Sequence, residues 1–346
     1  MRCFIKKEVF NHRCQGREMM IDNVLRKTWV AFVILLIIGV HVDSATALQQ
    51  HSDSPPDAAT STNGFYFVHI TDTHVLHKIF DRNEFQKNRL QTVLKHVTSF
   101  KEKPAFVVIT GDLVEWGSGV SGALNYQAFN GCFYEKEGEL YADSDCSIPV
   151  YTTPGNHDYF WSRTLFNYHR FVDKKHVKEK DRYTVTFNGL TLFFLDSGHN
   201  EINYEAKPLD WVYVLGSGLF LRDIEWLDDA LNSCTSQHKI VIMHHPAINW
   251  GEYDVIAHNR EVFISLCDEC NVDLVLTGHT HAARVFDSNG NFYPNNIFPL
   301  NLSFYPTLYV QTDAVKEGCY YRNVTVSSGS IWLGSCEQCC ETAFGI

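Results

Sequence analysis

The sequence lacks an apolar run long enough to span a membrane, and it lacks a surplus of positive charge. The apolar stretch Trp29–Val40 has 12 residues, whereas a spanning helix needs about 17–25. The 346-residue chain carries 29 Lys and Arg against 40 Asp and Glu, a formal net charge of −11. This balance argues against specific nucleic-acid binding, which depends on clustered basic residues. Internal repeats and low-complexity tracts are also missing after residue 63, so a repeat architecture is not indicated.

A basic N-terminal segment followed by the short apolar stretch has the form of a secretory signal. Ala45-Thr46-Ala47 matches the A-x-A form of a signal-peptidase site. We therefore expect residues 1–47 to be a cleaved signal peptide, and because this leader is long, Met19 or Met20 is an alternative start of translation. The alternative is an uncleaved signal anchor, which makes a type II membrane protein. Both interpretations place the main domain in the lumen of the secretory pathway or outside the cell.

After the leader, we expect a short linker and one large domain. Residues 48–63 are rich in Ser, Thr, Asp, Pro and Ala and predict a flexible linker. Residues 64–346 form the expected domain. Asn301-Leu302-Ser303 and Asn323-Val324-Thr325 have the form of glycosylation sites, which agrees with export.

The cysteines permit two interpretations. Nine of the 11 follow residue 47, and an odd number leaves at least one free or paired between chains. Cys267-x-x-Cys270 and Cys336-x-x-Cys339 could bind zinc. In an oxidising compartment, disulfides between the C-terminal segment and the core are favoured.

Short apolar runs alternate with amphipathic stretches from Phe65 onward. Runs rich in β-branched and aromatic residues predict strands at Phe65–Ile70, Ala105–Thr110, Pro149–Thr153, Arg182–Phe187, Leu190–Asp196, Lys239–Met243, Val272–Thr277, Leu308–Thr312 and Tyr320–Ser327. Helical spacing predicts helices at Arg82–Phe100, Ile224–Leu231 and Arg260–Cys270. Asn188-Gly189 predicts a hairpin turn. The alternation indicates an α/β layered fold, with a β-rich segment from about residue 286.

Five predicted strands run directly into polar clusters. The clusters are Asp72-Thr73-His74, Gly111-Asp112, Gly155-Asn156-His157-Asp158, His244-His245 and Gly278-His279-Thr280-His281. Ligands of open α/β sheets bind beyond the carboxyl ends of strands, so we expect the clusters to meet at one rim. Each cluster alone has a plainer explanation, such as a tight turn at Gly155-Asn156 or a cap at Gly111-Asp112.

Together the clusters offer two Asp, one Asn and four His suited to metal binding. This set matches the needs of two divalent cations about 3.5–4 Å apart. Asp112 follows a central strand and is the natural bridging carboxylate. A water bound to both ions would become a hydroxide nucleophile near neutral pH, and the same ions would bind phosphate oxygens. Fe, Mn and Zn all suit these ligands.

The order D-x-H, G-D, G-N-H-D, H and G-H-x-H resembles that of the calcineurin-like metallophosphoesterase family, over residues 65–285 approximately. The resemblance implies a two-sheet β-sandwich flanked by helices, with a dinuclear metal site at one edge. It implies a ligand set in which Asp112 is shared by both metals, Asp72, His74 and His281 bind the first, and Asn156, His244 and His279 bind the second.

The resemblance also implies roles for three further residues. His157 corresponds to the family's histidine that donates a proton or hydrogen bond to the leaving group. Asp158 would fix the tautomer of that imidazole. His244 stands two residues before a proline, as the family's ligand does, which leaves His245 as a possible phosphate contact.

Glu115 departs from one branch of the family. Purple acid phosphatases have a tyrosine three residues after the bridging aspartate, where this chain has Glu115. The pattern is closer to class III cyclic nucleotide phosphodiesterases, a similarity that extends over Val68–His74. We therefore expect a phosphodiesterase or a broad phosphatase that acts on a small-molecule or lipid phosphoester. Monoester, linear diester, cyclic nucleotide and lipid substrates stay open, as does the oligomeric state. A catalytically silent scaffold that keeps the fold is the alternative.

Overall fold

The computed structural model describes most of the expected domain. The described residues are 64–135, 138–139, 148–160, 162, 164–172, 182–198, 217–250, 254–327 and 329–339, and they belong to one compact unit, Pro55–Ile346. The expected signal peptide, 1–47, and linker, 48–63, lie outside them. No helix in these ranges is long and apolar enough to cross a membrane.

The first sheet joins the beginning of the described chain to its end. In spatial order its strands are β11 (Leu300–Asn301), β14 (Ser330–Gln338), β13 (Tyr320–Ser327), β1 (Phe65–Ile70), β2 (Val107–Thr110) and β5 (Val150–Thr153). β1, β2 and β5 run parallel, whereas β13 runs antiparallel to β1. The carboxyl ends of the three parallel strands therefore lie at the same edge.

The second sheet is mostly parallel. In spatial order its strands are β10 (Arg284–Asp287), β12 (Leu308–Gln311), β9 (Leu274–Thr277), β8 (His238–Ile242), β7 (Leu190–Phe194) and β6 (Tyr183–Phe187). β12, β9, β8 and β7 run parallel, and the two edge strands run antiparallel to their neighbours. The turn between β6 and β7 has positive φ at Asn188 (43°) and Gly189 (80°), as the predicted Asn-Gly hairpin requires.

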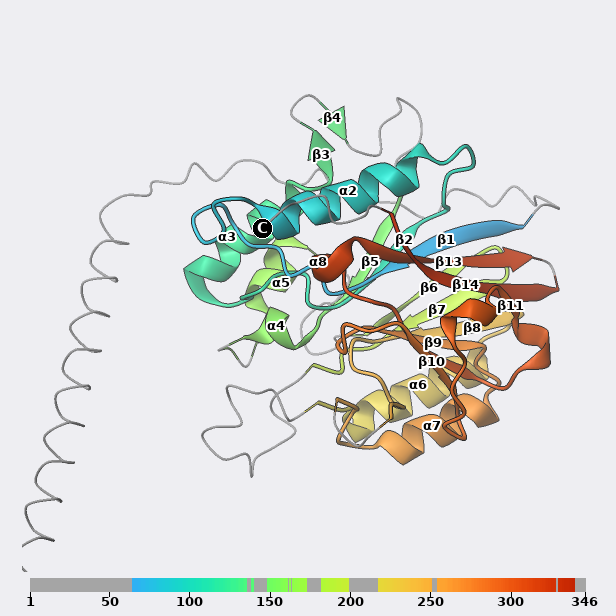
Figure 1. Ribbon diagram of the computed structural model, residues 1–346. Helices are drawn as coiled ribbons and strands as arrows, with labels where there is room; N and C mark the ends of the chain where they lie inside the picture. Colours follow the sequence, from blue (N-terminus) through green and yellow to red (C-terminus); the bar gives the residue numbers. More distant parts are fainter. Residues whose placement is uncertain are drawn as a thin grey trace, which may run out of the picture. The chain divides into compact units, whose positions relative to one another are not determined.

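Helices cover the outer side of each sheet (Figure 1). On the side of the first sheet lie α2 (Phe85–Ser99), α3 (Gly119–Asn130), α5 (Phe166–Phe171) and α8 (Val315–Gly318). On the side of the second sheet lie α6 (Leu221–Ser233) and α7 (Arg260–Glu269). The short elements are α4 (Asn156–Tyr159), β3 (Tyr134–Glu135), β4 (Gly138–Glu139), η2 (Asn295–Ile297) and η3 (Leu302–Phe304).

Successive strand residues face different apolar cores, because side chains alternate across a sheet. Phe67 of β1 packs between the sheets with Ile240 and Ile242 of β8. Val68, the next residue of β1, packs on the opposite side with Leu90 of α2. A third core joins the outer side of the second sheet to α6 and α7. The order helices, sheet, sheet, helices confirms the predicted α/β two-sheet sandwich.

The described cysteines support neither interpretation of their spacing. No two of them form a disulfide with each other, while Cys146 and Cys340 lie outside the described residues. No cysteine belongs to a group of potential metal ligands in the described part of the chain. Cys267 is instead buried in the core between α7 and the second sheet.

Candidate metal centre

The five polar clusters meet where parallel strands of both sheets end. Asp72 and His74 follow β1, Asp112 follows β2, and Asn156 opens α4 directly after β5. From the second sheet, His244 follows β8, and His279 and His281 follow β9. The two sheets thus contribute opposite walls of one site.

The first group of potential ligands contains Asp72, His74 and His281, whose ligand atoms lie within 4.8 Å of one another. Nε2 of His74 is 3.7 Å, and Nε2 of His281 3.3 Å, from Oδ1 of Asp72. Oδ1 of Asp72 and Nε2 of His74 are buried and have no hydrogen-bond partner among the described residues. Buried polar atoms without partners are costly, and a cation between them would satisfy both.

Asp112 lies between the first group and the second. Its Oδ2 is 3.4 Å from Nε2 of His74 and 3.3 Å from Nε2 of His244. Its Oδ1 accepts a hydrogen bond from the backbone N–H of His157 at 2.8 Å. One carboxylate oxygen therefore faces imidazoles of both groups, while the other fixes the carboxylate.

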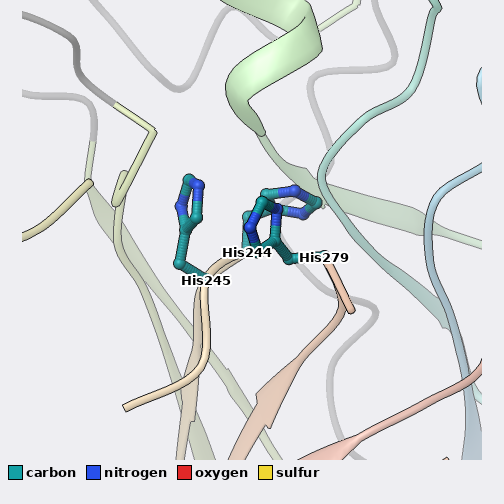
Figure 2. A group of neighbouring side chains, drawn as sticks. All are labelled: His244, His245 and His279. Atoms are coloured by element: carbon teal, nitrogen blue, oxygen red, sulfur yellow. The ribbon is translucent and has the colours of Figure 1, made fainter. Parts of the chain in front are cut away.

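The second group contains Asn156, His244 and His279. Oδ1 of Asn156 is 3.1 Å from Nε2 of His244 and 3.1 Å from Nδ1 of His279. His245 joins His244 and His279 in a cluster whose nitrogens lie within 4.8 Å of one another, and Figure 2 shows the three rings rising from the loops after β8 and β9. An amide oxygen, imidazoles and a shared carboxylate suit a borderline divalent cation.

The outward-facing nitrogens of two rings are held by hydrogen bonds. Nδ1 of His74 donates to Oε2 of Glu115 at 2.8 Å, and Nδ1 of His244 donates to the carbonyl of Thr110 at 2.7 Å. In the neutral ring such bonds leave Nε2 as the nitrogen with the lone pair, and they fix its direction. Nδ1 of His281 lies 3.5 Å from Oε1 of Glu317. Sequence reasoning assigned no role to Glu115, Thr110 or Glu317.

The backbone of the site is left-handed at five potential ligands. These are Asp72 (φ 53°), His74 (45°), Asp112 (49°), His279 (69°) and His281 (48°). Non-glycine residues adopt this region at an energetic cost, and such residues gather at functional sites. Asp and His tolerate it better than most residues do. The sharp reversals let two side chains from one short loop reach the same point.

Glycines allow the loops to approach one another. A Cβ on Gly111, which has φ of 79°, would lie 2.5 Å from Nδ1 of His244. A Cβ on Gly278 would lie 1.8 Å from Oγ1 of Thr71. Real Cβ atoms do not come so close, so the site needs glycine at both positions.

The charges of the centre shift pKa values in opposite directions. Burial alone would raise the pKa of Asp72 and of Asp112, but neighbouring imidazoles hold both well below their usual range. Burial alone would lower the pKa of His74 and of His244, but neighbouring carboxylates raise each to about 9. At neutral pH the carboxylates are therefore ionised and attract positive charge.

The structure places Asp158 differently from the sequence-based expectation. Nδ1 of His157 donates to the main-chain carbonyl of Glu115 at 2.8 Å. The carboxylate of Asp158 instead accepts from the N–H of Gly155, the N–H of Leu113 and the hydroxyl of Tyr126. Asp158 thus joins two loops, and the ring of His157 is oriented by Glu115.

His245 lies at the edge of the second group. Its Nδ1 is 3.2 Å from Oγ of Ser197, which also accepts from the N–H of His245 at 3.0 Å. Its Nε2 is buried and has no hydrogen-bond partner among the described residues. Burial and the neighbouring His279 and His244 lower the pKa of His245 well below its usual value, so the ring is neutral.

A family model agrees with the site and the fold. The model described as calcineurin-like phosphoesterase matches residues 65–283. This range contains all the potential metal ligands described above.

Two curated proteins are similar in sequence. A protein of Arcobacter nitrofigilis named "Probable glycerophosphodiester phosphodiesterase GpdQ" is 26% identical over 222 residues, which cover 62% of this chain and 71% of that protein. A protein of Danio rerio named "Transmembrane protein with metallophosphoesterase domain" is 22% identical over 282 residues, which cover 78% of this chain. The match spans only 53% of the zebrafish protein.

Two solved structures share the fold at low sequence identity. GAP50, titled the anchor in the inner membrane complex of Plasmodium, has a TM-score of 0.51 and 13% identity over 80% of this chain and 85% of its own. The purple acid phosphatase PPD1 of yellow lupin (Lupinus luteus) has a TM-score of 0.51 and 11% identity over 77% of this chain and 50% of its own.

Proposed function

The chain belongs to the calcineurin-like phosphoesterase family of phosphoric ester hydrolases, and we propose that it hydrolyses phosphodiesters with two divalent cations. The observation that carries this proposal is the position of Asp112, whose Oδ2 lies 3.4 Å from Nε2 of His74 and 3.3 Å from Nε2 of His244. A carboxylate oxygen shared between two ligand groups is what a pair of closely spaced cations requires.

Seven residues would hold the two ions. Asp72, His74 and His281 bind the first, Asn156, His244 and His279 bind the second, and Asp112 binds both. Fe, Mn and Zn all accept this set of nitrogen and oxygen ligands. When bound, the ions would supply Lewis-acid chemistry: they would lower the pKa of a bound water and neutralise negative charge on the phosphoryl oxygens.

His157 acts on the leaving group. Its side chain is 26% exposed, and its ring centroid is 4.5 Å from that of His74, so it stands beside the first ligand group and is open to solvent. Glu115 fixes Nδ1 as a donor to its carbonyl, which leaves Nε2 to face the substrate. Protonated at Nε2, His157 donates to the departing oxygen, an effect worth about 10²–10⁴ in rate. Asp158 supports this role indirectly, because it joins the loop of His157 to the loop after β2.

His245 is proposed to contact a phosphate oxygen. Its Nδ1 faces Ser197, so Nε2 is the nitrogen available to the second ligand group. A neutral imidazole that accepts from the serine hydroxyl at Nδ1 presents N–H at Nε2. That N–H can donate to an anionic oxygen without the cost of burying another charge.

A phosphodiester is the proposed substrate class, as a small molecule or a lipid. The name of the Arcobacter relative supports a diester, and Glu115, which stands where purple acid phosphatases have tyrosine, sets the chain apart from that branch. We further propose that residues 1–47 direct the chain into the secretory pathway, so that the enzyme acts in its lumen or outside the cell.

Matched monoester and diester substrates test the proposal. We expect metal-free protein reconstituted with Mn²⁺ or Zn²⁺ to hydrolyse bis(4-nitrophenyl) phosphate faster than 4-nitrophenyl phosphate. Asp112→Ala should lose metal and activity together, whereas His157→Ala should keep two ions per chain and lose rate. A native protein that holds two ions and hydrolyses neither compound would favour the scaffold alternative, and faster monoester hydrolysis would favour a phosphatase.

A further inference from the structure

His69 is a histidine of the V-H-I-T-D-T-H stretch that the proposed ligand set leaves unused. It lies in β1, three residues before Asp72, and its side chain is 0% exposed. It shares a strand face with Phe67, which packs between the two sheets. A polar ring in this apolar layer costs free energy unless both of its nitrogens are bonded.

Both nitrogens of His69 are bonded, and their partners belong to different sheets. Nε2 is 2.8 Å from Oγ1 of Thr110, the last residue of β2 in the first sheet. Nδ1 is 2.8 Å from Oγ1 of Thr312, which directly follows β12 in the second sheet. Oγ1 of Thr312 also accepts from Nε of the buried Arg322 at 3.4 Å. His69 therefore ties the two sheets together beneath the centre.

The hydrogen bonds of His69 to Thr110 and Thr312 are those of a neutral imidazole. Burial, and next the positive charge of Arg322, lower the pKa of His69 to about 3. A neutral ring has one donor and one acceptor nitrogen, and a threonine hydroxyl can fill either role. The two bonds are therefore satisfied whichever nitrogen carries the proton.

Thr110 connects His69 to the metal centre, because it contacts His69 with its side chain and His244 with its main-chain carbonyl. Its carbonyl accepts from Nδ1 of His244 at 2.7 Å and from Oγ1 of Thr71 at 2.9 Å. Oγ1 of Thr71 also lies 2.7 Å from Oδ2 of Asp72, so its single hydroxyl proton is shared between the Thr110 carbonyl and the Asp72 carboxylate. A shift of Thr110 would thus move the acceptor that orients His244 and change how the Thr71 hydroxyl is shared with Asp72.

We propose that His69 is a positioning residue for the metal centre, because it joins Thr110 to Thr312 and so fixes the carbonyl that orients His244. This inference rests on the proposed function, since it assumes that His244 is a metal ligand. An apolar side chain could fill the same space, but it would make no hydrogen bond to Thr110 or Thr312. The position of Thr110 relative to Thr312 would then no longer be fixed.

Metal binding, measured apart from catalysis, separates this role from a purely structural one. Metal-free full-length protein is titrated with Co²⁺, followed by its visible absorption, and affinities come from competition with a chelating dye. We expect His69→Leu to weaken the binding of one of the two ions by about 10–100-fold and to lower kcat for the diester more than it changes KM. Phe67→Leu is the matched control: it should lower Tm and leave both affinities native.

Variants of Thr312 make the test independent of whether His69→Leu folds. Thr312→Val removes the hydroxyl that bonds to Nδ1 of His69 and should weaken the binding of the same ion. Thr312→Ser keeps the hydroxyl and should bind both ions with native affinity. The double variant His69→Leu/Thr312→Val should bind the ion no more weakly than His69→Leu does, because both substitutions remove the same hydrogen bond.

The outcomes distinguish this inference from the proposed function. Native affinities in both His69→Leu and Thr312→Val would overturn the positioning role alone. Equal losses of metal affinity in His69→Leu and Phe67→Leu would also overturn it, since they would show a general effect of core packing. A native protein that takes up no pair of ions would overturn the proposed function, and this inference with it.

Discussion

Nδ1 of His74 donates a hydrogen bond of 2.8 Å to Oε2 of Glu115. Glu115 also accepts, through its main-chain carbonyl, from Nδ1 of His157 at 2.8 Å. One residue thereby orients a proposed metal ligand with its carboxylate and the proposed proton donor with its backbone. Oε1 of Glu115 also lies 3.7 Å from Nδ1 of His157, but the hydrogen bond to His157 comes from the main chain, so substitution of Glu115 removes the bond to His74 and keeps the bond to His157.

Glu115→Ala is expected to weaken metal binding while it leaves the orientation of His157 in place. Loss of a partner that holds a ligating histidine costs about 10–100-fold in metal affinity or activity. Glu115→Gln keeps an oxygen that can accept from Nδ1, so its effect should be smaller. Chelator competition with Mn²⁺ measures both variants. Glu261→Gln, on a side chain that is 79% exposed, is the control, and an equal loss there would contradict the assignment.

Metal affinity should rise with pH. His74 and His244 have pKa values of about 9 without bound metal, because neighbouring carboxylates outweigh burial. Below that pH a cation must displace their protons, and above it the competition ends. We expect the apparent affinity for Mn²⁺ to rise by about tenfold per pH unit for each proton released, up to about pH 9. An affinity that stays constant from about pH 6.5 to 8.5 would contradict this expectation.

Gly111→Ala should abolish metal binding, whereas Gly290→Ala should not. The two glycines have nearly the same φ, 79° and 80°, so both substitutions carry a left-handed strain of about 1–2 kcal/mol. A Cβ on Gly111 would strike the ring of His244, but nothing lies within 4 Å of a Cβ on Gly290. Denaturant unfolding should therefore show a lower free energy of unfolding in both variants, and metal content should fall only in Gly111→Ala.

If the chain is exported, we expect Asn301 to carry a glycan and Asn323 to carry none. Asn301 belongs to β11, the edge strand of the first sheet, and begins a short turn in which it accepts from the N–H of Ser303. Asn323 lies in β13, between β1 and β14, and its Oδ1 is buried. Asn301→Gln should remove the shift that glycosidase treatment produces on a gel. A shift that disappears only in Asn323→Gln would contradict this assignment.

Buried strands were predictable because their sequence is a continuous apolar run. β1 has the predicted bounds, and β8 and β9 begin or end within two residues of theirs. α3 was not predicted, because Gly119–Asn130 has no clear apolar stripe. β14 was missed as well: glycine and small polar residues interrupt its apolar positions, and its pairing with β13 contains a shift in register.

The meeting of the five clusters was predictable from strand direction, but their inner contacts were not. Asp72 and His74 follow β1 and have left-handed backbones, so the regular alternation of side chains along a strand does not describe how they meet. The role of Asp158 was misplaced for a similar reason. Its carboxylate sits at the start of α4, where backbone N–H groups compete for it, and sequence spacing does not reveal that competition.

The pairing of β1 with β13 has a consequence for biosynthesis. Phe65 lies opposite Val326, whereas the family match ends at residue 283. The first strand of the described residues therefore gains its antiparallel neighbour only after β13, Tyr320–Ser327, has emerged from the ribosome. A nascent chain stopped at residue 283 would contain every proposed ligand but would leave one side of β1 open, so the set of ligands is complete in the chain before the first sheet is.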